Sequence, residues 1–478
     1  MEDWMDEEQE DMSLSDLMGL VQQFEQSQQS SKPLFFDEDS YERIILFYQE
    51  NREFKRALSV TETALEQYPY SPTFFILKAE VLAEQNQFEE ALNILEIAET
   101  LDANEITIYL IRADIYLWTS QHKKALEQLS LALPLASEKD DFTDIYLLKA
   151  DVFEDQEQYL EVIDALEEAI KADPYSEEAL SRLGFAVEIT EAFERSEVFH
   201  RELTESDPYN HFAWFNLGHA LYYLHRFDDA IEAFEFVVAI QDDFEPAHIF
   251  LGDVWFEKEE YSKALEKYMD ASKIGKSRKE TFFKIAECYE QLTDFKNCRY
   301  YLRKATNIDA TYDDAFYKIG ETYLAENNYN QAVQAYERAV KISPENTSFL
   351  IALGNAHMLN EDTDTALSYF SKAIDLEPNV KSHYINLANG FFSAEDFNNS
   401  IDTLELCYSL FPSATDVLYI KTVFLFQIGQ RKEALATLEK AINIDTKDLS
   451  LIFDMNPLLT EDDAVMLLLE NYGLTDFS

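Results

Sequence analysis

Apolar residues recur along the chain at the spacing of amphipathic helices. Trp214, Leu217, Gly218 and Leu221 follow one another at i, i+3, i+4 and i+7, which places them on one helix face. The pattern has a fixed period, because residues 313–346 and 347–380 carry it in the same frame, 34 residues apart. A fixed period of this length is typical of repeat architectures. We therefore expect one solenoid rather than several separate domains.

Extending this frame in both directions predicts twelve repeats over residues 38–448, each a pair of helices. The predicted repeats begin at Glu38, Pro72, Ile106, Thr143, Glu177, His211, Glu245, Lys279, Asp313, Thr347, Lys381 and Thr415. Twelve repeats of 34 residues make 408, whereas the repeats span 411 residues. The surplus of three falls near residues 137–142, where we expect an irregular connection.

Small residues stand at fixed positions of the repeat. Position eight is Ala or Gly in ten repeats, with Ile45 and Thr422 as the exceptions, and position twenty is Ala in eight. Two helices approach closely only where side chains are short, so these positions predict contact between the two helices of a repeat. Proline at position thirty-two of six repeats indicates the end of the second helix.

These positions resemble the signature of the tetratricopeptide repeat family over residues 38–448, about 86% of the chain. The signature is met closely by Trp214, Leu217, Gly218, Ala230 and Phe234, and by Gly320, Tyr323, Ala332, Tyr336, Ala339 and Pro344. The resemblance implies an all-α fold, an α-solenoid in which stacked antiparallel helical hairpins form a right-handed superhelix. It also implies that the first helix of each repeat lines a concave groove.

Two segments lie outside the repeats. Residues 1–37 hold ten acidic residues against Lys32 alone, which indicates an acidic, flexible tail. Its apolar stripe predicts one short helix and consists of Leu14, Leu17, Met18, Val21 and Phe24. Residues 449–478 predict capping helices that close the solenoid, with Thr460 and Asp463 spaced like a capping box.

The charge of the chain excludes several classes of function. With 38 Lys and Arg against 93 Asp and Glu, the net charge is −55, which repels a nucleic-acid backbone. There is no apolar run of about 18 residues, and the first residues are acidic where a signal peptide needs a basic end. We expect a cytoplasmic protein that binds neither nucleic acid nor a membrane. Three cysteines are too few for a disulfide framework.

Motifs of catalysis are missing from the sequence. It contains no H-E-x-x-H, G-x-S-x-G, G-x-G-x-x-G or C-x-x-C pattern. Residues 270–277, DASKIGKS, end like a phosphate-binding loop, but they lack its first glycine and follow a helix rather than a strand. The densest histidine group lacks the spacing of metal ligands on one helix face and consists of His211, His219, His225 and His248. We predict no enzyme, no cofactor and no metal site.

Family geometry places positions two, five, nine, twelve and thirteen of each repeat in the groove, and these positions are aromatic around the sixth repeat. The aromatic set is Phe212, Phe215, His219, Tyr222 and Tyr223, flanked by Phe185 and Phe256. Such side chains anchor apolar or aromatic groups of a partner. The alternative is that some of them pack between neighbouring first helices.

Position nine predicts a second pattern in the groove. It carries carboxylates in Glu80, Asp114, Asp151, Asp253, Glu287 and Glu321, followed by the amides Asn355 and Asn389. A row of carboxylates suits a Lys- or Arg-bearing partner, and the amides suit the backbone of an extended peptide. A solvated row of acids without any ligand is the alternative. Together the patterns predict a non-enzymatic adaptor or assembly scaffold whose protein or peptide partner carries basic and apolar residues.

One stretch has the opposite charge. Residues 263–304 hold eleven basic and six acidic residues, a net charge of +5, and they include Lys296, Arg299, Arg303 and Lys304. An ordinary helix surface of mixed charge accounts for this stretch. The alternative function is a structural protein that associates with a second copy of itself, the acidic tail of one chain meeting the basic stretch of another.

Overall fold

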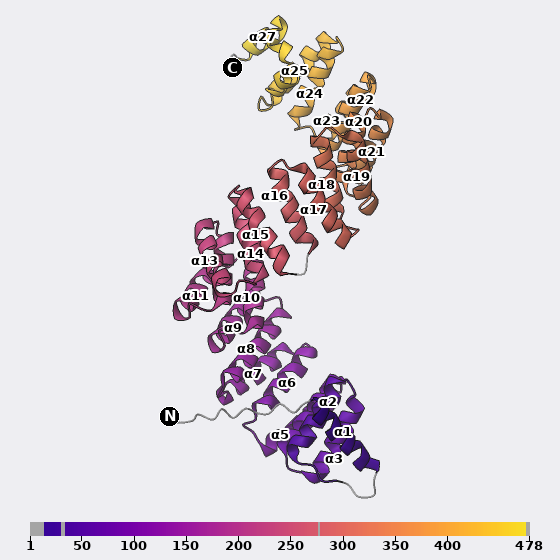
Figure 1. Cartoon of the computed structure of the whole chain (residues 1–478). Coiled ribbons are helices and arrows are strands. Elements are labelled where there is room, and N and C mark those ends of the chain that lie inside the picture. Colours follow the sequence, from indigo (N-terminus) through magenta and orange to yellow (C-terminus); the bar gives the residue numbers. More distant parts are fainter. Residues whose placement is uncertain (1–13, 30–33, 276–277, 475–478) are drawn as a thin grey trace. The chain divides into compact units, whose positions relative to one another are not determined.

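A computed structural model describes residues 14–29, 34–275 and 278–474. These residues form 27 α-helices and two short 3-10 helices, and the described part of the chain contains no β-strand (Figure 1). The predicted all-α fold of stacked antiparallel hairpins is confirmed. The chain divides into two units, residues 1–242 and 243–478, each of which is described by itself.

The N-terminal unit contains one leading helix and six hairpins (Figure 1). Its helices are α1 (Leu14–Gln29), α2 (Glu38–Glu50), α3 (Phe54–Gln67), α4 (Pro72–Glu84), α5 (Phe88–Leu101), α6 (Ile106–Trp118), α7 (His122–Ala132), η1 (Leu133–Leu135), α8 (Lys139–Glu154), α9 (Tyr159–Ala172), α10 (Glu177–Thr190), α11 (Phe193–Ser206), α12 (His211–Tyr223) and α13 (Phe227–Ile240).

The C-terminal unit contains the other six hairpins and three short closing helices. Its helices are α14 (Glu245–Glu257), α15 (Tyr261–Ile274), α16 (Lys279–Gln291), α17 (Phe295–Ile308), α18 (Asp313–Ala325), α19 (Tyr329–Ile342), α20 (Thr347–Leu359), α21 (Thr363–Leu376), α22 (Lys381–Ser393), α23 (Phe397–Leu410), α24 (Thr415–Gln427), α25 (Arg431–Ile444), α26 (Leu451–Met455), η2 (Pro457–Glu461) and α27 (Asp463–Asn471).

The predicted starts of the repeats match the starts of the first helices, with one exception. Eleven first helices begin at the predicted residue, whereas α8 begins at Lys139, four residues before Thr143. The surplus residues extend α8 by a turn instead of forming a longer loop. A capping box stabilises this extra turn. The Glu138 side chain accepts a hydrogen bond from the backbone N–H of Asp141, and the Asp141 side chain accepts one from the backbone N–H of Glu138.

Every hairpin turns through one left-handed residue at position fifteen of its repeat. Eleven of these are not glycine, among them Arg52, Glu191 and Thr293, and the twelfth is Gly429. The next residue donates its backbone N–H to the carbonyl five residues earlier, as Glu53 does to Tyr48 at 2.7 Å and Gln430 does to Leu425 at 2.8 Å. This is the Schellman arrangement, which satisfies carbonyl groups that the end of the first helix leaves without partners.

The two helices of a repeat meet where position eight faces position twenty-four. A Cβ atom added to Gly218, Gly252, Gly320 or Gly354 would lie 2.4–2.7 Å from the ring at position twenty-four. Those rings are Phe234, Tyr268, Tyr336 and Phe370, and all are at most 2% exposed. Repeats with Ala at position eight carry Leu instead, as in Ala79 with Leu95 and Ala286 with Leu302. A smaller residue at position eight is therefore accompanied by a larger one at the facing position twenty-four.

Both ends of the repeats are covered by further helices. The apolar stripe of the tail lies on α1, where Val21 and Phe24 are buried and Phe24 packs edge to face against Phe36 and Tyr41. The acidic residues 1–13 and the linker residues 30–33 lie outside the described residues. None of the helices in the described ranges has the length and apolar character that a membrane span requires.

The predicted capping box at the C-terminal end is wrong. Thr460 lies inside η2, where its hydroxyl group donates to the Pro457 carbonyl at 2.7 Å. The N-cap of α27 is Asp462, whose carboxylate accepts from the backbone N–H groups of Ala464 and Val465 at 3.1 Å. The 3-10 helix therefore delays the start of α27 and leaves the cap to Asp462.

Candidate partner-binding surfaces

The predicted aromatic residues of the N-terminal unit lie on α10 and α12 and differ in exposure. Phe185 on α10 is 59% exposed and Tyr223 on α12 is 41% exposed, whereas His219 is buried. Phe212, Phe215 and Tyr222 are half-buried. Phe185 therefore offers more apolar surface to a partner than the other members of this set.

His219 and Tyr223 bind residues of the preceding repeat. His219 Nε2 lies 2.9 Å from Glu188 Oε1, and the Tyr223 hydroxyl group donates to the same oxygen at 3.3 Å. The Tyr223 ring stacks on Phe193 at 4.6 Å. Burial lowers the pKa of His219, and Glu188 opposes this effect. These contacts join α10, α11 and α12, so part of the aromatic set has a structural role.

The carboxylates at position nine in the C-terminal unit are largely neutralised within the protein. Asp253 on α14 accepts from Lys284 Nζ on α16 at 2.6 Å and from the Tyr268 hydroxyl group on α15 at 2.5 Å. Lys318 on α18 lies 3.4 Å from Glu321, and its charge opposes the effect of burial, which raises the pKa of Glu287. Asp253 thus joins consecutive repeats, whereas Lys318 and Glu321 pair within α18.

The cations of this row are functional residues that the sequence reasoning missed. Lys284 and Lys318 both stand at position six, and so does Arg182, which donates to Asp151 at 2.5 Å in the N-terminal unit. The signal was a basic residue at position six of the repeat that follows an acid at position nine. Phe256, which was predicted to flank the aromatic set, is half-buried, and its ring centre lies 5.2 Å from that of Tyr261.

Asp114 on α6 has no such cation. Position six of the next repeat is Leu148, and no basic nitrogen in the described residues lies within 4 Å of Asp114. Burial raises the pKa of Asp114 to about 6, with a further increase from the charge of Asp151. Burial also raises the pKa of Glu80 on α4. Within the described residues, neither Glu80 nor Asp114 therefore has a basic partner within 4 Å.

Amide side chains line two adjoining cavities of the C-terminal unit. Asn355 on α20 and Asn386 on α22 line both cavities, which have volumes of about 270 and 300 Å³, and Asn389 lines the first of them. Asn355 and Asn389 are exposed. Within the described residues, none of these three amide groups forms a hydrogen bond to another protein group. Their donors and acceptors are directed to solvent or to a ligand.

Asn355 and Asn386 stand at positions nine and six of consecutive repeats, the positions that Asp253 and Lys284 occupy elsewhere. There an ion pair joins α14 and α16. Between α20 and α22 two neutral amides line the cavities instead. The other polar lining consists of Ser348, Ser382, Ser393, Tyr317 and His383, and the apolar lining includes Ile351, Met358 and Leu359.

The basic residues predicted as a second contact lie on the second helix α17. Arg299 pairs with Glu326 at 2.9 Å, and Lys304 Nζ lies 5.0 Å from the centres of the Tyr300 and Tyr301 rings. Lys296 is exposed. Arg303 donates to the Tyr323 hydroxyl group at 2.8 Å. These residues are separate from the amide-lined cavities, which first helices line.

The His, Cys, Asp and Glu side chains of the described ranges form neither a metal cluster nor a disulfide. No set of three His, Cys, Asp or Glu side chains there has the arrangement of a metal site. Cys288, Cys298 and Cys407 are buried and not paired with one another, and burial raises the pKa of the Cys288 and Cys298 thiols to about 12. These thiols are therefore protonated at neutral pH.

Sequence profiles of repeat families match several parts of the chain. Profiles described as tetratricopeptide repeat match residues 143–176, 215–277, 280–312 and 347–380, and a profile described as TPR repeat matches residues 320–361. No curated protein sequence matches the chain.

Similar folds occur among solved structures. The crystal structure of the APC/C hetero-tetramer Cut9-Hcn1 has 14% identity and a TM-score of 0.38, covering 86% of this chain and 96% of that chain. The C-terminal part of a TPR repeat-containing protein from Cytophaga hutchinsonii has 18% identity and a TM-score of 0.44, and the match covers 49% of this chain and 96% of that chain. YrrB, a TPR protein with an unusual peptide-binding site, has 18% identity and a TM-score of 0.33, and the match covers 37% of this chain and 92% of that chain.

Proposed function

Because the chain belongs to the tetratricopeptide repeat family, we propose that it is a non-enzymatic adaptor or scaffold that binds a protein partner through an extended segment. One observation carries this proposal: Asn355, Asn386 and Asn389 line two adjoining cavities without protein hydrogen-bond partners in the described residues. A carboxamide both donates and accepts, so it can bind a peptide N–H and a neighbouring carbonyl together.

The lining supports a segment of mixed side chains rather than a strongly charged one. The cavities contain no Lys, Arg, Asp or Glu, and Ile351, Met358 and Leu359 supply apolar contact area. Backbone hydrogen bonds with the amides would fix the position of the segment, and the apolar pockets would select its side chains. We expect small or medium apolar residues in the bound segment.

The N-terminal unit offers a second contact area for the same partner. Phe185 is exposed on α10, and α4 and α6 carry Glu80 and Asp114, which have no ion-pair partner among the described residues. An apolar side chain would contact Phe185, and a Lys or Arg side chain would approach the carboxylates. A partner with both residue types matches the preference expected from the sequence.

Capture of partners tests the proposal. Proteins cross-linked to the wild-type chain in a lysate are identified by mass spectrometry, and the capture is repeated with N355A/N389A and with F185A. We expect the N355A/N389A variant to lose the partners that bind the C-terminal unit while its helical content and unfolding temperature stay the same. The matched control is Asn398→Ala, which removes an exposed amide from the second helix α23. Undiminished capture by both N355A/N389A and F185A would refute the proposal.

A further inference from the structure

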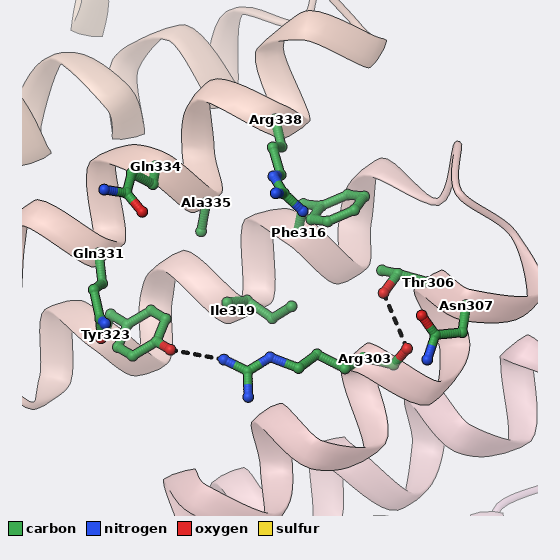
Figure 2. Close-up of a pocket in the computed structure, with 10 residues that line it drawn as sticks. All are labelled: Arg303, Thr306, Asn307, Phe316, Ile319, Tyr323, Gln331, Gln334, Ala335 and Arg338. Carbon is green, nitrogen blue, oxygen red and sulfur yellow. Dashed lines mark hydrogen bonds between the residues drawn. The ribbon is translucent and has the colours of Figure 1, made fainter.

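A third cavity lies among α17, α18 and α19, and two second helices supply most of its lining (Figure 2). Its volume is about 460 Å³. Phe316, Ile319 and Ala335 supply its apolar surface, and Arg303 and Arg338 bring two guanidinium groups to it. The remaining polar lining consists of Thr306, Asn307, Gln331, Gln334 and the Tyr323 hydroxyl group.

Contacts with the protein hold both arginines in place without neutralising them. Arg303 donates to the Tyr323 hydroxyl group at 2.8 Å, as Figure 2 shows, and Arg338 lies over the Phe316 ring at 5.6 Å. Within the described residues, no carboxylate oxygen lies within 4 Å of either guanidinium group. In contrast, Arg182 and Arg195 each pair with two or more carboxylates.

The pair of cations is specific to this junction between repeats. Arg303 stands at position twenty-five of the eighth repeat and Arg338 at position twenty-six of the ninth. At the other ten junctions these two positions never hold two basic residues, and the adjacent junctions carry Met269 with Lys304 and Glu337 with Lys372. A repeat surface of average composition therefore does not account for the pair, in a chain with 93 acidic and 38 basic residues.

The chemistry of the lining indicates its ligand. A guanidinium group binds a carboxylate through two parallel hydrogen bonds, and the aromatic ring of Phe316 with Ile319 accepts an apolar side chain. The amides Asn307, Gln331 and Gln334 stand at the cavity where they can bind a peptide backbone. We propose that this cavity binds a short acidic segment of a protein partner, in which an apolar or aromatic residue adjoins the acidic side chains.

This site uses second helices and differs in charge from the amide-lined cavities, so it does not rest on the function proposed above. Arg303 belongs to the basic stretch recognised in the sequence, whereas Arg338 lies 34 residues beyond the end of that stretch at Lys304. The two arginines meet only because successive second helices stack. The expected partners of the two sites differ, since no Lys, Arg, Asp or Glu lines the amide-lined cavities.

Binding of a labelled peptide tests the inference. The probe is Gly-Asp-Glu-Phe-Asp-Glu-Gly with a fluorescent label, titrated with the full chain at low salt and followed by fluorescence anisotropy. We expect saturable binding that weakens as salt is added. The variant R303Q/R338Q should bind at least tenfold more weakly, and the peptide Gly-Asn-Gln-Phe-Asn-Gln-Gly should not bind.

Controls separate a specific site from general charge attraction. K341Q/K372Q removes two positive charges from exposed residues of α19 and α21, and it should bind the acidic peptide as the wild type does. N355A/N389A should also keep this binding, because it changes the other site. The inference is overturned if R303Q/R338Q and K341Q/K372Q bind equally well, if the amide peptide binds as well as the acidic one, or if only a phosphoserine version of the peptide binds.

Discussion

Carboxylates at position nine show how one neighbouring residue changes the state of a side chain. Asp253 forms an ion pair with Lys284 of the next first helix. For Asp114, the residue at the position that corresponds to Lys284 is Leu148. Burial without a cation raises the pKa of Asp114 to about 6. The folded protein therefore favours the protonated form of Asp114 more strongly than the unfolded chain does.

The substitution Asp114→Asn should stabilise the protein at neutral and alkaline pH. Asp114 contributes stability that is fully present below its unfolded pKa near 3.8 and is lost as the pH rises through about 6. At pH 8 the variant should gain on the order of 2 kcal/mol in the free energy of unfolding, and at pH 4 almost nothing. Urea unfolding at both pH values measures this gain. An equal gain at both would contradict the assigned cause.

His200 should have the opposite effect on stability. It is fully buried, Nδ1 donates to the Ser196 carbonyl at 2.9 Å and Nε2 accepts from Asn216 Nδ2 at 3.3 Å, which requires a neutral ring. Burial lowers its pKa to about 4. Stability present above pH 6.5 is therefore lost as the pH falls toward 4.

The measurement for His200 is the slope of unfolding free energy against pH between 6.5 and 4. Replacement by Leu, which six other repeats carry at this position, should remove a loss of roughly 3 kcal/mol across that range. Asn216 keeps its hydrogen bond to the Leu180 carbonyl at 3.2 Å in this variant. If the slope of unfolding free energy against pH is the same in the variant, groups other than His200 cause the loss of stability at low pH.

At the scale of the helical element, the side chains at two facing positions of a hairpin compensate each other in volume. Gly354 at position eight leaves room for Phe370 at position twenty-four, whereas Ala388 faces Leu404 in the next repeat. The same balance gives a reason for Ile45 at position eight of the first repeat, because Thr61 stands at its position twenty-four. Close packing requires the sum of the two side chains to stay nearly constant.

Gly354→Ala should destabilise the protein by about 1 to 3 kcal/mol, since its Cβ would lie 2.5 Å from Phe370 Cε1. Adding Phe370→Leu should recover most of this loss, because it recreates the Ala–Leu combination of other repeats. Gly184→Ala is the matched control: its Cβ would contact only Asn216 Oδ1 at 3.8 Å, so the higher helix propensity of Ala should leave stability equal or slightly higher. Thermal unfolding of the variants tests whether the two positions compensate each other in volume. This explanation is wrong if the double variant G354A/F370L unfolds at no higher temperature than G354A.

The period of the sequence predicted the start of eleven first helices, because small residues and apolar faces recur with every repeat. It did not predict the start of α8, since the extra turn depends on the local capping box of Glu138 and Asp141. The hairpin turns also escaped prediction. Their left-handed residue is Arg, Ser, Glu, Thr or another non-glycine residue in eleven repeats, so residue type carries no signal there.

At the scale of the whole chain, the candidate sites were harder to predict than the fold. The residues predicted for the groove lie on first helices, and Asn355 and Asn389 are exposed, but their role as a peptide contact stays a prediction. The neutralisation of Asp253 by Lys284 joins residues 31 positions apart, and a reading of position nine alone could not detect it. Arg303 and Arg338 likewise form one site only through the stacking of repeats.

The distribution of cations therefore distinguishes the surfaces better than the net charge of −55 does. Cations at position six neutralise Asp151, Asp253 and Glu321, while no Lys, Arg, Asp or Glu lines the amide-lined cavities and two arginines line the Arg303–Arg338 cavity. These differences support the two proposals, an extended segment of mixed side chains for the amide-lined cavities and an acidic segment for the other.

We propose that amide side chains of the C-terminal unit bind the backbone of a partner. The most direct measurement is calorimetric titration of the wild type and N355A/N389A with a peptide taken from the partner region cross-linked to α20 and α22. We predict at least a tenfold loss of affinity in the variant, and a similar loss when the peptide backbone is N-methylated at the contact positions. Full affinity of N355A/N389A for this peptide would contradict the account.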